Sequence, residues 1–304
     1  MKNIKYYAAA AGAMLCWSST YIWYKIALDY YNPISIIISR LFVAVIITFI
    51  ASHIFKKTEK IQKKDYKLFL LMSLFEPFLY FLGETYGMQF VPPSIGAIII
   101  STIPLLTPIF AGIFLNEKIT IYGIIGLIIS FFGVTIILYN DFTGTSSLIG
   151  IGLLFFAVLS GISYGVILKK VSINYSSVTI VKIQSLLGFI YILPLFIIFE
   201  SKDFFSVTPD FRIVSTILKL SLLGSVLAFV LITIATRNIG LNNANIFANL
   251  IPVFTAVISY FTIGEEFSLK KIVGIGIVIT GLFISQYHRR FKIRYFSKKA
   301  RNDS

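Results

Sequence analysis

The chain has 304 residues, of which 57% are apolar and 13% are charged, and its formal net charge is +14. Soluble domains carry roughly 25% charged residues, and extended exposed apolar patches are rare on soluble monomers. High hydrophobicity with low charge also excludes a disordered chain. A single cysteine excludes a disulfide framework, and two histidines leave little for a zinc site. The composition therefore indicates an integral membrane protein.

Apolar runs of about 20 residues recur along the chain, the length at which a helix spans ~30 Å of hydrocarbon. Strands of an outer-membrane barrel would instead alternate in polarity over about 10 residues, and these runs do not. The sequence thus predicts an all-α integral membrane protein with ten transmembrane helices and no soluble domain. The ten runs cover about 5–28, 33–55, 68–90, 93–115, 120–139, 148–169, 178–199, 213–236, 241–263 and 269–287.

Lysine and arginine residues fall mostly in alternate connections between these runs. They gather at the N-terminus, in the linker 56–67, and in the tail 288–304, while the linker 200–212 and the turn near 270 hold few. The protein is expected in the plasma (inner) membrane. By the positive-inside rule, both of its termini are expected in the cytoplasm. The positive charge is then a topology signal and an attraction to anionic lipid, and no nucleic-acid partner is expected.

An internal repeat appears when the chain is shifted by 148 residues. The shift pairs Pro104 with Pro252, Thr107 with Thr255, Glu117 with Glu265, Gly126 with Gly274, and Gly133 with Gly281. A repeat of five spans is odd-numbered, so the second half must enter the membrane upside down. We therefore expect a five-helix repeat over 1–140, an inverted five-helix repeat over 141–287 and a basic cytoplasmic tail over 288–304. Inverted repeats are a feature of secondary transporters, whose substrate site lies near the midplane.

Two motifs resemble those of the EamA-type drug/metabolite transporters. One is W-S-S-T-Y-I-W-Y-K from Trp17 to Lys25, and the other is the duplicated P-x-x-T pattern with a glutamate that ends spans four and nine. The resemblance covers nearly the whole chain. It implies ten helices with cytoplasmic ends, a central cavity built mainly from the first four helices of each half, and movement of small organic solutes. Family members include exporters of amino acids and related metabolites, so membership does not name the substrate.

Span three carries two acids that are candidates for ion coupling. Glu76 and Glu84 lie ~80° apart around a helix with Tyr80 between them, so all three can face one cavity. An ionisable group inside a bilayer costs several kcal/mol and needs a partner or a task. Glu76 has no basic residue at a matching depth, so we expect it to exchange a proton. A protonated acid hydrogen-bonded to a tyrosine or a carbonyl, or a direct substrate contact, are the alternatives. Pro77 predicts a kink or an opened turn.

Two basic residues are candidates for binding an anionic group of the substrate. Arg40 lies about 10 Å deep in span two at 1.5 Å per residue, and Lys25 lies at the outer end of span one. Arg40 either forms a structural ion pair with Glu84 or meets a substrate carboxylate, for which arginine offers a planar two-point contact. Lys25 either joins it or extends to the lipid headgroups.

Amides and an aromatic residue complete the expected substrate site. Asn245 and Asn249 share one helical face of span nine, where they either bind a polar solute or pack helices closely. Trp17, with Tyr21 and Tyr164, is expected in a cavity wall, and Tyr80 is expected to contact substrate. The paired glycines are expected to pack helices within the bundle or between two protomers, which leaves a homodimer open.

The motifs of ATP hydrolysis and of common metal or serine catalysis do not occur in the sequence. We therefore expect no enzyme and no cofactor. The predicted function is a secondary active transporter, exporting small polar metabolites such as amino acids by alternating access, with protons as the hypothesised coupling ion. Three alternatives stay open. A sugar-phosphate or nucleotide-sugar exchanger would need more basic residues at depth, and a membrane enzyme acting on lipid intermediates would need paired acids or histidines near one interface. A passive channel is the third.

Overall fold

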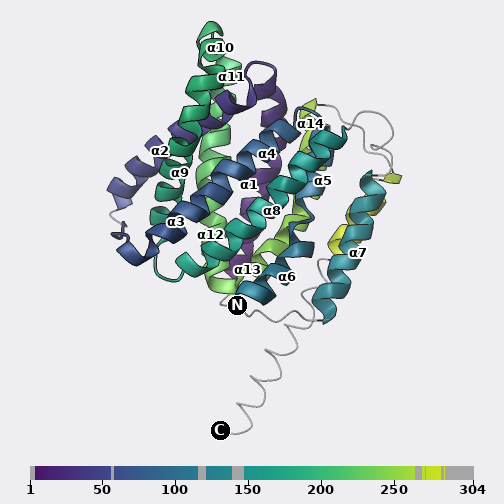
Figure 1. Cartoon of the computed structure of the whole chain (residues 1–304). Coiled ribbons are helices and arrows are strands. Elements are labelled where there is room, and N and C mark those ends of the chain that lie inside the picture. Colours follow the sequence, from purple (N-terminus) through teal and green to yellow (C-terminus); the bar gives the residue numbers. More distant parts are fainter. Residues whose placement is uncertain are drawn as a thin grey trace.

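The structure is a computed structural model that describes residues 4–55, 58–115, 121–138, 147–263, 269–270, 272–281 and 284. Every regular element among these residues is helical, which confirms the all-α prediction (Figure 1). The α-helices are α1 (Ile4–Leu28), α2 (Pro33–Phe55), α3 (Tyr66–Ser73), α4 (Tyr80–Gly87), α5 (Pro93–Ile100), α6 (Ile103–Leu115), α7 (Ile121–Leu138), α8 (Leu148–Val171), α9 (Ser177–Leu195), α10 (Ser201–Ser206), α11 (Phe211–Lys219), α12 (Ala228–Ile239), α13 (Leu241–Asn245) and α14 (Ile251–Ile263). The helix Ile272–Gly281 follows them.

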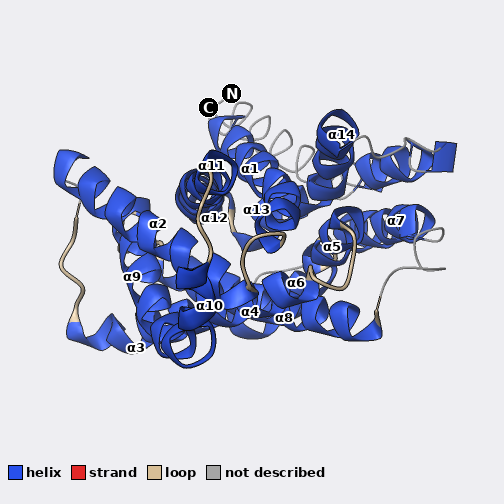
Figure 2. Cartoon of the chain, turned by 90° about the horizontal axis from the view of Figure 1, so that it is seen from above, coloured by secondary structure: helices blue, strands red, loops and turns tan. Residues whose placement is uncertain are grey.

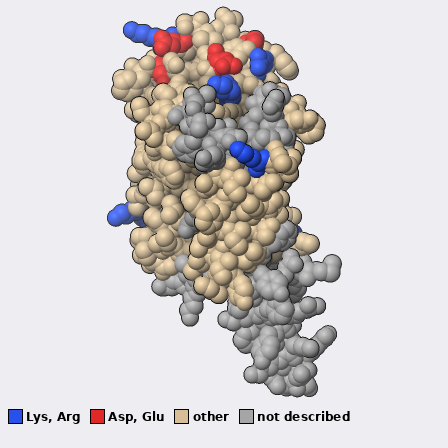
Figure 3. Space-filling view, turned by 90° about the vertical axis from the view of Figure 1, so that its right-hand side faces the viewer, with Lys and Arg blue, Asp and Glu red and all other residues tan. Residues whose placement is uncertain are grey.

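Six helices are long and apolar enough to cross a membrane, namely Pro33–Ile54, Lys63–Gly87, Leu148–Val171, Ser177–Ser206, Phe211–Ile239 and Leu241–Thr262. The shorter apolar helices Leu106–Leu115, Ile121–Gly133 and Ile272–Gly281 add to them. Large apolar side chains point outward, such as Phe132 of α7 at 61% exposure. Figure 3 shows charged side chains mainly toward one end of one face, above a broad uncharged band. The chain is therefore a multi-pass membrane protein.

Several predicted features lie outside the described residues. They are the glutamates Glu117 and Glu265 and the basic tail 288–304. The N-terminal end of α1 and the linker before α3 lie at one end of the helix bundle, and α10 lies at the opposite end (Figure 1).

Five of the apolar segments within the described residues change helical geometry along their length, one of them at the π-helical turn Phe196–Glu200 between α9 and α10. π-Helical turns occupy Leu74–Leu79 in span three and Leu220–Leu227 in span eight. Span four breaks between α5 and α6, and span nine passes through the 3₁₀ segment Ile246–Leu250 before α14. The starts of α6 and α14, Ile103 and Ile251, are 148 residues apart, the same shift that aligns the sequence repeat. The kink predicted at Pro77 is confirmed, because Glu76 leaves helical geometry with φ −147° and ψ 121°.

The helices of the two halves pack on one another in a reciprocal way. In the first half α1 packs on α12 of the second, and α8 of the second packs on α4 of the first. The helices at corresponding positions also meet, with α2 beside α9 and α5 beside α14 (Figure 2). The buried apolar core lies among α1, α2, α4, α8, α9 and α12, so the centre of the molecule is built by both halves.

The paired glycines bring α7 against the helix Ile272–Gly281. A Cβ atom added to Gly133 would lie 2.8 Å from the carbonyl oxygen of Gly274, and one added to Gly281 would lie 2.5 Å from that of Gly126. Between them the Ser130 hydroxyl donates to the carbonyl of Val278 at 3.2 Å. These glycines therefore allow close helix packing inside one chain.

Alanine at Gly281 should destabilise the protein by about 1–3 kcal/mol, since the added methyl group meets backbone atoms that cannot give way easily. Gly276 lies on the same helix, and a Cβ atom there would meet nothing within 4 Å, so Gly276→Ala is the matched control and should change little. Chemical denaturation of the detergent-solubilised variants measures both effects. Equal stability of the two variants would show that the α7 contact does not limit stability.

A glutamate forms hydrogen bonds at each end of the contact between α2 and α9. The Glu59 carboxylate accepts hydrogen bonds from the backbone N–H of Ser176 at 3.2 Å and from the hydroxyls of Ser176 at 2.8 Å and Thr179, at the start of α9. At the opposite end, Glu200 accepts from the backbone N–H groups of Ile34 at 3.2 Å and Ser35 at 2.7 Å, at the start of α2. Each acid satisfies backbone donors that a helix start leaves free.

Glu59→Gln should cost at most about 1 kcal/mol at neutral pH, because the group is exposed. Partial burial opposes ionisation, but hydrogen bonds from Thr179 and Ser176 outweigh it and lower the pKa of Glu59 below its ordinary value of 4.5. A lowered folded-state pKa stabilises the protein above the unfolded value and ceases to do so as the pH falls through the folded value. The difference in unfolding free energy between wild type and Glu59→Gln should therefore shrink below about pH 4.5.

Candidate functional site

A cavity of about 60 Å³ lies at the centre of the bundle, between the two halves. Its walls come from α1, α2, the kinked span of α3 and α4, the α5–α6 junction, α8, α12 and the broken span of α13 and α14. Three charged side chains line it, Arg40, Glu76 and Glu84. A small polar space with charged groups, enclosed by apolar and aromatic walls, has the features of a solute-binding site.

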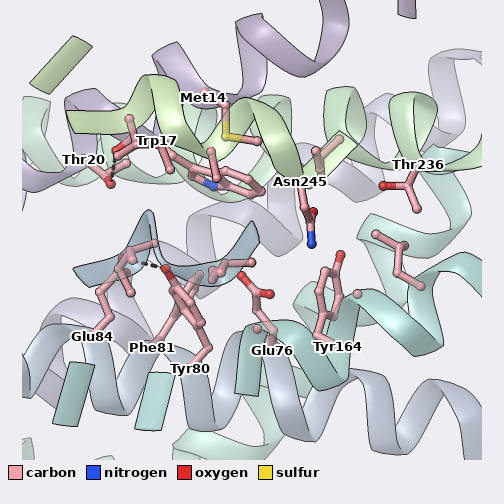
Figure 4. Close-up of a pocket in the computed structure, with 18 of the residues that line it drawn as sticks. Met14, Trp17, Thr20, Glu76, Tyr80, Phe81, Glu84, Tyr164, Thr236 and Asn245 are labelled. Atoms are coloured by element: carbon pink, nitrogen blue, oxygen red, sulfur yellow. Dashed lines mark hydrogen bonds between the residues drawn. The ribbon is translucent and has the colours of Figure 1, made fainter. Parts of the chain in front are cut away.

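Most of the residues predicted for the site lie at this cavity. Trp17, Arg40, Tyr80, Asn245, Glu76 and Glu84 all line it, as do Tyr21 and Tyr164. Figure 4 shows Trp17 and Asn245 on one wall and Tyr80, Glu76 and Tyr164 on the opposite wall. The cavity therefore joins side chains from both halves of the chain that are far apart in sequence.

Two predicted residues are not at the cavity. Lys25 is exposed at the outer part of α1 and does not line the space, which fits the headgroup alternative for its side chain. Asn249 is buried, and its side-chain amide donates to the hydroxyl of Ser130 on α7 at 3.2 Å. Asn249 thus follows the packing alternative, whereas Asn245, one turn earlier, faces the cavity and donates to the Thr107 hydroxyl at 3.0 Å.

Arg40 is fully buried and held by several groups at once. Its Nε donates to the Ser225 hydroxyl at 2.8 Å, and its Nη1 donates to the hydroxyl of Tyr24. The guanidinium carbon lies 4.0 Å from the centre of the Phe81 ring, a cation–π distance. A Cβ atom at Gly224 would come 2.7 Å from the Thr20 side chain and 3.1 Å from Nη2, so glycine at 224 leaves space for the guanidinium.

Arg40 and Glu84 are connected through Tyr24 and do not form the direct ion pair that sequence reasoning offered. The Tyr24 hydroxyl donates to the Glu84 carboxylate at 3.0 Å, and the Tyr80 hydroxyl donates to its other oxygen at 3.1 Å. The Tyr24 hydroxyl, from α1, therefore bonds to both the arginine on α2 and the carboxylate on α4. The two buried charges compensate each other through this hydroxyl in a low-dielectric interior.

Glu76 differs from the other two charged residues. It is 6% exposed, lies in the opened turn before Pro77 and points into the cavity (Figure 4). Within the described part of the chain its carboxyl group has no hydrogen-bond partner, so the predicted bond to a tyrosine or a carbonyl is not made. Burying a carboxyl group without a partner costs free energy. In a cavity, such a group can bind a proton or a ligand.

Other cavity features were not anticipated from the sequence. Trp17 donates its indole N–H to the carbonyl of Gly224 at 3.2 Å and packs edge-on against Phe229, which places the α1 aromatic face against α12. Tyr164 donates to buried Gln184 at 3.0 Å. The hydroxyl of Thr236, at the end of the cavity near Arg237, is buried without a partner. Tyr24 was within reach of prediction, because it follows Tyr21 by three residues on the same helical face.

Comparison with known proteins fits this architecture. The model of the EamA-like transporter family matches the chain twice, over residues 4–139 and 148–287. The chain belongs to the EamA-like transporter family. It is 30% identical over 229 residues to the uncharacterized transporter YetK of Bacillus subtilis (strain 168), covering 73% of this chain and 68% of YetK.

A further relative supports the assignment of this EamA-family chain, and a solved structure shares its fold. The uncharacterized transporter YoaV of Bacillus subtilis (strain 168) is 23% identical over 276 residues, which is 90% of this chain and 94% of YoaV. A known crystal structure has the same fold, with a TM-score of 0.75 over 93% of this chain and 97% of the other, at 14% identity.

Proposed function

We propose that this EamA-family chain is a secondary active transporter of small polar solutes, which works by alternating access. The observation that carries the proposal is the central cavity, which both halves enclose and into which an unpartnered carboxylate points. Such a cavity at the middle of a two-part helical bundle is the arrangement in which secondary transporters bind their solutes. Amino acids and related metabolites are the proposed solutes and export is the proposed direction, following the resemblance to family exporters.

The two halves are proposed to be inverted five-helix repeats, so that the chain has ten spans. The double match of one family model supports this. The packing supports it as well, because shifting both partners of the Gly133–Gly274 contact by 148 residues yields the Gly281–Gly126 contact. A contact that maps onto itself in this way is what a two-fold axis between the halves would produce. An odd number of spans in each half would make that axis lie in the membrane plane.

Alternating access is proposed because the cavity is too small for a solute in the present state. Pockets for small molecules measure about 300–1,000 Å³, several times the 60 Å³ here, so the walls must separate to admit an amino acid. The lining reaches Leu168 and Thr236, next to Lys169 and Arg237, which is the end predicted to be cytoplasmic. We propose that this end opens when the halves rock apart.

Glu76 is proposed to bind the coupling proton, with Glu84 as the second ion-coupling candidate. Glu84 is already held by two tyrosine hydroxyls, whereas Glu76 is not, so Glu76 can gain and lose a proton without breaking other bonds. Its equivalent at the 148-residue shift is Gly224. The acid therefore occurs in one half only. This is expected for a functional group that is not part of the repeated scaffold.

Transport is tested by uptake into proteoliposomes containing the purified protein, with amino acids, amines, nucleosides and sugar phosphates as solutes. We expect saturable movement of a small polar solute that a pH gradient accelerates or drives uphill. Empty liposomes are the control. Hydrolysis of a lipid substrate without any solute movement would instead favour the membrane-enzyme alternative, and movement that does not saturate would favour a channel.

The proposed orientation is tested by labelling single cysteines in a Cys16→Ser background. Lys60 lies in the linker before α3, and Lys202 lies in α10 at the opposite end of the bundle. A membrane-impermeant maleimide added to intact cells should label Lys202→Cys and should label Lys60→Cys only after the membrane is opened. The reverse pattern would invert the topology and exchange the two faces of the cavity.

A further inference from the structure

We propose that the cavity selects solutes that carry an organic ammonium group, and that this group binds the carboxylate of Glu76. The inference rests on the proposed transport function and names the substrate class of the same cavity. It differs from the expectation from sequence, in which Arg40 and Lys25 would bind a solute carboxylate.

The charges around the cavity leave one negative group uncompensated. Arg40 and Glu84 balance each other through the Tyr24 hydroxyl, which bonds to both. Glu76 is the remaining charged residue of the lining, and Lys25 is exposed outside it. A solute that carries a positive charge would give Glu76 the partner that the described residues do not supply, and an anionic solute would add a second unpaired negative charge.

The Arg40 guanidinium already makes several contacts within the protein, which makes it a weaker binding group for a solute anion. Nε and Nη1 donate to Ser225 and Tyr24, and one face of the guanidinium lies on Phe81. A Cβ atom added at Gly224 would lie 3.1 Å from Nη2, for which the described residues supply no hydrogen bond. The two-point contact that makes arginine a good carboxylate receptor requires two adjacent free N–H groups, so a solute carboxylate would compete with the bonds that Nε and Nη1 already make.

The walls around Glu76 are suited to a cation. Tyr80 and Tyr164 stand on the same wall as Glu76, and Trp17 stands on the wall opposite (Figure 4). Aromatic rings attract ammonium groups through their electron-rich faces, most strongly when water is excluded. The same rings offer no comparable attraction to a carboxylate. Charge and surroundings therefore favour the same class of ligand.

The closing experiment measures binding and transport separately. Trp17 is one of two tryptophans in the chain, so its fluorescence in a Trp23→Phe background reports on cavity occupancy in detergent. Propylamine, propanol and propionate are the probes, because they share a size and differ in charge. We expect propylamine to bind at least tenfold more tightly than propanol or propionate. This comparison uses no cavity variant and does not depend on the folding of one.

Variants then identify the group that binds the amine. Glu76→Gln should weaken propylamine binding at least tenfold and leave propanol binding unchanged, while Glu76→Asp should restore part of the amine affinity. Lys25→Ala, outside the cavity, should leave all three affinities unchanged. Propionate binding that equals or exceeds propylamine binding, or amine binding that survives in a folded Glu76→Gln protein, would overturn the inference.

Proteoliposome counterflow with the same probes separates this inference from the proposed function. Amine binding that depends on Glu76, without counterflow of any solute, would retain the site and reject transport. Counterflow of propionate that Glu76→Gln leaves unchanged would retain transport and reject the selectivity.

Discussion

Replacing Arg40 with methionine should lower the free energy of unfolding by about 3–5 kcal/mol, the cost of removing one partner from a buried charge pair. Methionine keeps much of the length and volume of the arginine stem, so the effect is mainly electrostatic and not a cavity effect. The variant leaves the Glu84 carboxylate with its two tyrosine donors but without a countercharge. Denaturant titration of the solubilised protein measures the loss.

A double-mutant cycle determines how much of this loss comes from the Arg40–Glu84 relation. Arg40→Met combined with Glu84→Gln should be less destabilising than the sum of the two single changes by roughly 0.5–3 kcal/mol, because each single change leaves the other charge unpaired. Lys25→Ala removes an exposed charge from the same region and should change stability little. Additive single effects would show that the Tyr24 bridge does not couple the two charges.

Glu76→Gln should abolish accumulation driven by a pH gradient while the protein stays folded. Exchange of one proton per solute across a difference of one pH unit supports about tenfold accumulation, since one pH unit corresponds to 1.36 kcal/mol. Glutamine fills the same space and cannot release a proton. Proteoliposomes containing the variant should therefore reach equal solute concentrations inside and outside, even with the gradient maintained.

Two controls make this result specific to Glu76. Glu76→Asp keeps a titratable carboxyl and should retain gradient-driven accumulation, at a reduced rate because the carboxyl is displaced. A thermal unfolding curve for each variant separates loss of coupling from loss of folding. If Glu76→Gln accumulates solute tenfold like the wild type, the proton passes elsewhere, and Glu84→Gln becomes the next variant to examine.

These two experiments examine different parts of one site. The Arg40–Tyr24–Glu84 group links α1, α2 and α4 and reaches the π-helical segment Leu220–Leu227 before α12 through Ser225 and Gly224, so its role is to hold helices of both halves together. Glu76 lies beside this group without bonding to it. The structure thus separates a bonded pair of charges, suited to stability, from a single acid that is available to ligands.

The sequence by itself determined the features that depend on local composition. Runs of about 20 apolar residues predict membrane helices because burying a backbone in lipid requires its hydrogen bonds to close within one segment. The 148-residue repeat predicted the paired glycines, and Pro77 predicted the kink. Both predictions depend only on residue type and spacing. The cavity position of Glu76, Glu84 and Tyr80 also followed, since helical periodicity sets which residues of one helix share a face.

Only the tertiary structure decided which partners those residues meet. Asn245 and Asn249 share a helical face in the sequence, yet the 3₁₀ turn between α13 and α14 directs one to the cavity and the other to Ser130 on α7. Likewise, a direct ion pair with Glu84 was one of two expectations for Arg40, but α1 places Tyr24 between the two charges. Such contacts depend on how helices distant in sequence pack against each other, and helical period carries no information about the neighbouring helix.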